Sequence, residues 1–215
     1  MFRAILYVQW KWTRFLLLAC VLGATALPML TARSDFTGGE AYLSVLGNLE
    51  GIGIFYPFLA LVTGWVIAAG IWYPDRTGRH VYGMAMPVER WRFVLLRYGA
   101  GLLLALVPAL ALLLANLLVA LTVTLPPGLH PYPVALALRF ALASMVAFSF
   151  MFTLMAVEGA VVAKVVAGLF LLCLLVPVVS AWAGEETSFV RIINVLLTAP
   201  GPLSVFTGRW MLIDV

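Results

Sequence analysis

Charged residues are scarce in this chain: Asp, Glu, Lys and Arg make up 10% of its 215 residues, while 64% are hydrophobic. A soluble domain carries roughly 25% charged and about 45–50% apolar residues, so this composition excludes a soluble enzyme or binding domain. The length allows one unit of about 100–200 residues, which leaves no room for a soluble catalytic domain beside a membrane bundle. We therefore expect an all-α integral membrane protein with a single transmembrane domain over residues 1–215.

Cysteine and the motifs of catalysis are also lacking. Cys20 and Cys173 lie inside apolar runs without the C-x-x-C spacing of a metal or redox site. His80 and His130 fall in segments expected on opposite sides of the membrane, so they cannot share a site. The sequence contains no H-E-x-x-H zinc motif, no G-x-S-x-G nucleophile turn and no G-x-x-x-x-G-K-[ST] phosphate loop. We expect no catalytic residue, metal or cofactor in this chain.

Long runs without charge indicate the membrane spans. A spanning helix needs about 20 mostly apolar residues, and clusters of proline and glycine such as Pro126–Gly128 divide the longest run. Residues 189–198 are expected to form a short interfacial or re-entrant helix, and a sixth crossing is left open. The prediction is a polytopic helical bundle of five to six spans, with the first five at about residues 15–32, 51–73, 91–125, 133–157 and 164–183.

Basic residues are unevenly distributed between the two ends of these spans. Cytoplasmic segments of membrane proteins are enriched in Lys and Arg, and with the N-terminus inside, nine of the thirteen basic residues become cytoplasmic. We therefore expect a multi-pass protein of the cytoplasmic (inner) membrane with a cytoplasmic N-terminus. The basic residues assigned to the cytoplasmic side are Arg3, Lys11, Arg14, Arg76, Arg79, Arg90, Arg92, Arg97 and Lys164.

Small residues recur at four-residue steps in the second and third predicted spans. Such steps place small side chains on one face of a helix, where they let two helix backbones approach closely. At this level the packing partner is open: it is either another span of the same bundle or a second protomer. The residues are Ala60, Gly64 and Ala68 in the second span and Gly101, Ala105 and Ala109 in the third.

The segment between the second and third spans is the most informative loop. Asp75 is suited to cap the start of a helix, His80–Met86 has the pattern of a short helix with apolar side chains between charges, and Pro87 ends it. One interpretation is a basic loop whose methionines rest on the membrane interface. The other is a docking helix whose apolar side chains enter a groove of a partner protein.

This loop resembles that of the ABC-2 permeases, the membrane subunits of type 2 ATP-binding cassette (ABC) exporters. In that family the second span is followed by an acidic residue, a Gly-Thr-like turn, a short helix and a leucine-proline-hydrophobic-x-Arg run. The span number, the cytoplasmic N-terminus and the short turn between the fourth and fifth spans are similar too, although the family usually has six spans with both termini inside. The matching residues here are Asp75, Thr77-Gly78 in reversed order, the helix His80–Met86 and Met86-Pro87-Val88-Glu89-Arg90.

The resemblance implies a type 2 ABC exporter-like fold and a permease that moves substrate when coupled to a separate ATPase subunit, which would bind ATP and Mg. It also implies a dimer with a second permease, identical or related, and no nucleic-acid partner is expected. The alternatives are a non-ATP membrane protein, such as a secondary carrier or a structural scaffold subunit, and an intramembrane enzyme. The resemblance to the family's motif implies that the residues of the coupling helix and its flanks are Asp75, Arg76, Thr77, Gly78, Arg79, Tyr82, Met84, Met86, Pro87 and Arg90.

Overall fold

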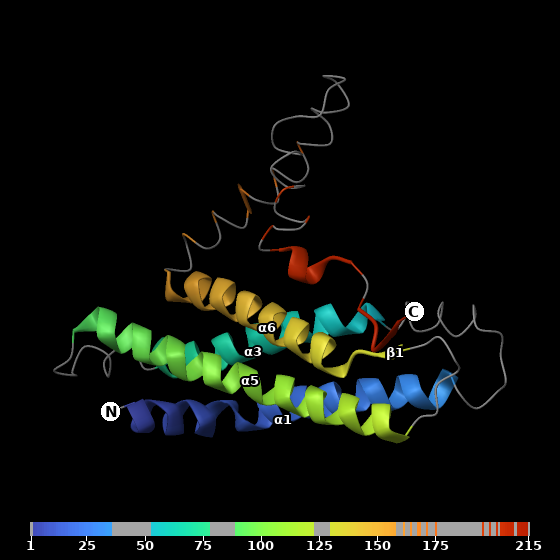
Figure 1. Cartoon of the computed structure of the whole chain (residues 1–215). Coiled ribbons are helices and arrows are strands. Elements are labelled where there is room, and N and C mark those ends of the chain that lie inside the picture. The colour runs from blue at the N-terminus through green and yellow to red at the C-terminus, as the bar shows by residue number, and fades with distance from the viewer. Residues whose placement is uncertain are drawn as a thin grey trace. The chain divides into compact units, whose positions relative to one another are not determined.

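The long elements of the computed structural model are four α-helices: α1 (Phe2–Asp35), α3 (Phe55–Thr77), α5 (Arg90–Thr122) and α6 (Pro133–Ala156) (Figure 1). Each of the four is long and apolar enough to cross a membrane. This result fits the expected all-α membrane bundle. Besides isolated positions between 161 and 201, the structure describes residues 2–35, 53–77, 89–122, 130–157, 203–208 and 210–214.

The contacts divide the chain into two compact units. The larger unit comprises Met1–Phe152 and Arg209–Val215, and the smaller comprises Thr153–Gly208. In the smaller unit, the 3-10 helix η1 (Ser204–Phe206) is stabilised by the Ser204 hydroxyl, which donates to the carbonyl oxygen of Gly201 at 2.6 Å. Apart from isolated positions, the predicted span at 164–183 and the short helix at 189–198 lie outside the described residues.

Helix α1 begins at Phe2, well before residue 15, where the first span was predicted to start. The segment from Phe2 to Arg14 contains no proline or glycine, so nothing in it ends a helix. Its basic residues Arg3, Lys11 and Arg14 lie within the helix and do not mark its start. At 1.5 Å per residue, α1 is about 50 Å long, against a hydrocarbon core of about 30 Å.

The other three helices differ from the predicted spans by a few residues at their ends. Helix α3 begins at Phe55 and continues to Thr77, while α5 covers Arg90–Thr122. Helix α6 begins at Pro133, a first position that suits proline because its missing N–H has no partner there. The charge-free runs therefore located these helices, whereas the exact ends depend on local chain geometry.

A stripe of residues along α1 packs against the bundle. Ile5, Gln9, Thr13 and Leu17 are all buried, at the four-residue spacing that places side chains on one helix face. Helix α1 makes most of its contacts with α5 and further contacts with α3. From Phe15 onward the exposed side of α1 carries large apolar side chains, among them Phe15 at 73% exposure, as a lipid-facing surface requires.

The two ends of the larger unit are named here after the residues that lie at them. The Arg97 end is where α3 ends and where α1 and α5 begin, so that Phe2, the first residue of α1, lies there (Figure 1). The Trp210 end is where α3 and α6 begin. There the strand β1 (His130–Pro131) pairs antiparallel with β2 (Ile213–Asp214), and a Cβ added at Gly53 would lie 2.5 Å from the carbonyl oxygen of Trp210. Phe2 and Asp214 thus lie at opposite ends of the unit.

Candidate functional site

Arg97 is the only charged side chain that is buried among the described residues, at 7% exposure. From its place near the start of α5, its Nη2 donates to the carbonyl oxygen of Ile71 in α3. Its guanidinium carbon lies 4.8 Å from the ring centre of Trp72 and 5.5 Å from that of Phe93. A charge buried among spanning helices is costly unless it is compensated. Here a carbonyl dipole and two aromatic faces compensate it and join α5 to α3.

Gln9 connects α1 to the same place. Its Nε2 donates to the carbonyl oxygen of Arg97 at 3.1 Å, and the Thr13 hydroxyl donates to the carbonyl oxygen of Gln9 at 2.8 Å. Gln9 Oε1 and Trp72 Nε1 are buried without a hydrogen-bond partner among the described residues. An acceptor and a donor left in this way are where an internal water or a polar ligand atom binds. We call Gln9, Thr13, Ile71, Trp72, Phe93 and Arg97 the Arg97 cluster.

A group of aromatic rings extends the Arg97 cluster to α6. The Tyr98 hydroxyl lies 2.7 Å from Ser149 Oγ, and the Tyr98 ring lies 5.5 Å from that of Phe148 and 5.4 Å from that of Phe152. The Trp72 ring is 5.3 Å from Phe152. A hydrogen bond between membrane helices contributes about 0.6 kcal/mol on average. The Tyr98–Ser149 pair therefore acts with the ring packing to hold α6 against α3 and α5.

Two glycines permit the close approach of α6. A Cβ added at Gly64 in α3 would lie 2.5 Å from the backbone nitrogen of Phe148, and one added at Gly101 in α5 would lie 2.3 Å from Phe148 Cζ. Both glycines of the predicted four-residue steps therefore face α6 of the same chain. The four alanines of these steps are buried as well: Ala60, Ala68, Ala105 and Ala109.

The structure describes only the edges of the predicted coupling segment. Helix α3 continues through Thr77, so Asp75 lies inside a helix and does not cap a new one as predicted. The sequence has no glycine between Gly70 and Gly78, and glycine is the residue that most often ends a helix. Arg90 is the exposed first residue of α5. The side chains of Asp75, Arg76 and Thr77 lie outside the described residues, as do Gly78, Arg79, Tyr82, Met84, Met86 and Pro87.

The chain matches no protein-family model, no curated protein and no solved structure. The Arg97 cluster is therefore identified from burial and charge alone. An ionisable residue buried among membrane-spanning helices marks a candidate functional site because its desolvation has to be compensated by specific partners.

Arg97 follows the basic residues Arg90 and Arg92 in sequence, but its surroundings in the structure differ from theirs. Arg90 and Arg92 are exposed, and Arg92 Nε pairs with Glu89 at 2.9 Å. Arg97 lies about one and a half helical turns beyond Arg92 on α5 and is buried. The signal that could have found it is its position inside the predicted span 91–125. No comparable signal distinguishes Gln9, which lies outside every predicted span.

The chemistry available to the Arg97 cluster is binding and positioning. It supplies a fixed positive charge, one unpaired acceptor and one unpaired donor at a junction of three helices. Among the described residues, no group of three or more His, Cys, Asp or Glu side chains could hold a metal ion. Cys20, the cysteine that the structure describes, is buried and free.

Proposed function

We propose that this chain is the permease subunit of an ABC transporter of the exporter class, driven by a separate ATPase subunit. One observation carries the proposal: Arg97 joins the last turns of α3 to the first turns of α5. These two helices flank residues 78–88, the segment whose sequence resembles the ABC-2 coupling loop. A force applied to that segment would reach α3 and α5 together, because a charge-assisted hydrogen bond and a stacked ring resist their separation.

The Gln9 hydrogen bond extends this coupling to α1. Because Gln9 donates to the backbone of Arg97, α1 is connected to the same rigid junction. The ring contacts of Tyr98 and Phe152 extend it to α6. An ATPase that pulled on residues 78–88 would then move four helices as one body, as an alternating-access permease requires.

The finer features of the proposal follow the resemblance. The chain has five or six spans, its N-terminus is in the cytoplasm, and it works as a dimer with itself or a related permease in the inner membrane. ATP and Mg bind to the partner ATPase. Phe2 and Asp214 lie at opposite ends of the larger unit, and an odd number of crossings between these two residues favours five spans over six.

The deciding experiment purifies the chain in mild detergent and asks whether an ATPase co-purifies with it in stoichiometric amount. It then measures whether the chain stimulates ATP hydrolysis by that ATPase. Truncating a buried interface anchor costs about 2 kcal/mol or more. Tyr82→Ala and Met84→Asp should therefore lower stimulation at least tenfold at normal expression. Arg79→Ala should have a smaller, salt-sensitive effect, because charges at an interface rim mainly steer association.

The matched control is Tyr132→Ala, which removes an exposed tyrosine at the Trp210 end, far from the proposed docking segment. It should leave stimulation unchanged. Full stimulation in Met84→Asp would mean that the loop merely rests on the membrane interface. Purification without any ATPase would favour a secondary carrier or a scaffold subunit instead.

A further inference from the structure

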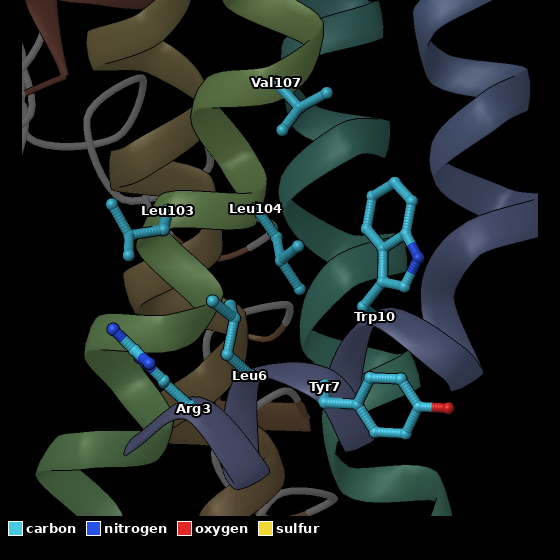
Figure 2. A pocket seen from close by; sticks show the side chains of 7 residues that line it. All are labelled: Arg3, Leu6, Tyr7, Trp10, Leu103, Leu104 and Val107. Atoms are coloured by element: carbon cyan, nitrogen blue, oxygen red, sulfur yellow. The ribbon is translucent and has the colours of Figure 1, made fainter.

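A groove lies between the first turns of α1 and the middle of α5. Helix α1 lines it with four side chains, the first from Arg3 and the last from Trp10. Helix α5 lines it with three, the first from Leu103 and the last from Val107 (Figure 2). Its volume of about 410 Å³ is within the range of ligand sites, which run from about 300 to 1,000 Å³. All lining side chains except Arg3 are apolar or aromatic. The groove therefore joins one cationic group to an apolar surface.

The charge of Arg3 is not balanced by the chain around it. Helix α1 has no acidic residue in its first turn, and Arg3 makes no ion pair within the described residues. Lys11 and Arg14 on the same helix are also exposed. The sequence from Phe2 to Ser34 contains basic residues and no acidic one. A ligand for this groove should accordingly carry a negative charge beside an apolar body.

We infer that the groove binds an anionic membrane phospholipid, with its phosphate on Arg3 and an acyl chain along Leu103 and Val107. Tyr7 and Trp10 line the groove from the same helix as Arg3, and tyrosine and tryptophan are enriched at the headgroup level of membranes. Basic residues at that level attract anionic lipids. The inference does not depend on the proposed transport function.

The test is native mass spectrometry of the purified full-length chain during addition of phosphatidylglycerol or phosphatidylcholine with identical acyl chains. One basic residue near an anionic headgroup changes affinity about fivefold. The intact chain should bind one phosphatidylglycerol about five times more tightly than phosphatidylcholine. Arg3→Gln should abolish this preference, and Leu103→Trp, which fills the groove, should weaken the binding of both lipids.

Two control variants change the same residue types outside the groove lining. Lys11→Gln removes a basic residue of α1, and Leu110→Trp enlarges an exposed leucine of α5. Both should keep the affinity and the preference of the intact chain, and circular dichroism should show equal helix content in all four variants.

Three results would overturn the inference. An unchanged preference in Arg3→Gln, or an equal loss in Lys11→Gln, would show that the charge acts only as diffuse surface potential. Binding of glycerol phosphate as tight as that of phosphatidylglycerol would show a free-anion site. A dimer mass that Leu103→Trp converts to a monomer mass would show that a second copy of the chain occupies the groove.

Discussion

Both ends of the larger unit place an arginine over a tryptophan, but they assemble the pair from different parts of the chain. At the Arg97 end the guanidinium carbon lies 4.8 Å from the Trp72 ring centre, and the two residues come from helices that follow each other closely in sequence. At the Trp210 end, Arg139 of α6 lies 4.6 Å from the ring centre of Trp210, which belongs to the C-terminal segment.

The two pairs differ in the burial of the arginine. Arg97 is buried, and its guanidinium donates to the backbone of α3. The side chain of Gln9 in turn donates to the carbonyl oxygen of Arg97. Arg139 is half-buried in the second turn of α6, where a long basic side chain can reach the membrane–water interface. The same pair of residue types therefore locks helices together at one end and secures a terminal segment at the other.

The largest expected effect is all-or-none and concerns which side of the membrane each end faces. With both native cysteines replaced by alanine, we expect single cysteines at Arg3 and Asp214 to react with a membrane-impermeant maleimide from opposite sides. The reason is that Phe2 and Asp214 lie at opposite ends of one unit. Labelling of both positions in intact cells, without permeabilisation, would contradict this arrangement. The cysteine-free background serves as the control.

The next largest effect is expected from Arg97→Met, which keeps an unbranched, flexible side chain and removes the guanidinium with its charge. A hydrogen bond to a charged group contributes about 1.5–3 kcal/mol, and a desolvated cation over a ring about 2 kcal/mol. We expect a loss of about 3 kcal/mol in detergent unfolding titrations. Arg92→Met, on the same helix but exposed, should change stability by less than about 0.5 kcal/mol. Equal effects of the two variants would remove the distinction between Arg97 and its neighbours.

Two glycines between the ends form a matched pair for testing how closely the helices pack, because a Cβ added at Gly64 would meet α6 and one added at Gly99 would meet nothing nearby. Gly64→Ala should destabilise by about 1–3 kcal/mol, because its Cβ would meet the backbone of Phe148. Gly99→Ala should stabilise by about 0.5–1 kcal/mol, because nothing lies within 4 Å of that Cβ and alanine favours the helix. Unfolding titrations of both variants measure the difference in sign. A stabilised Gly64→Ala variant would show that α6 does not pack closely on α3.

The smallest effect is expected at the Trp210 end. Arg139→Gln removes a partly solvated cation from the Trp210 ring, which corresponds to about 0.5–1 kcal/mol. Limited proteolysis should at the same time release the C-terminal segment more readily than in the intact chain. If Arg139→Gln destabilised the protein as much as Arg97→Met, the two ends would be equivalent, and the distinction drawn from burial would fail.

Different parts of the chain carry different amounts of structural information in their sequence, for a physical reason. The charge-free runs located α3, α5 and α6 within a few residues, because apolar length alone decides whether a helix can cross a membrane. Helix α1 begins at Phe2, before the predicted span 15–32, because charges limit membrane insertion and do not limit helix formation. The predicted coupling segment stays a prediction, and its Asp75 cap was wrong because α3 continues through that residue.

The sequence by itself determined that the chain is apolar, helical and suited to cross a membrane, since these properties follow from composition and from the lengths of uncharged runs. Only the tertiary structure decided which polar residues meet. Gln9 looks like any residue before a predicted span, and Arg97 like one more cytoplasmic charge, until α1, α3 and α5 pack and bring them together. Their roles depend on contacts between segments that are distant in sequence, and patterns of hydropathy and charge along the chain do not specify such contacts.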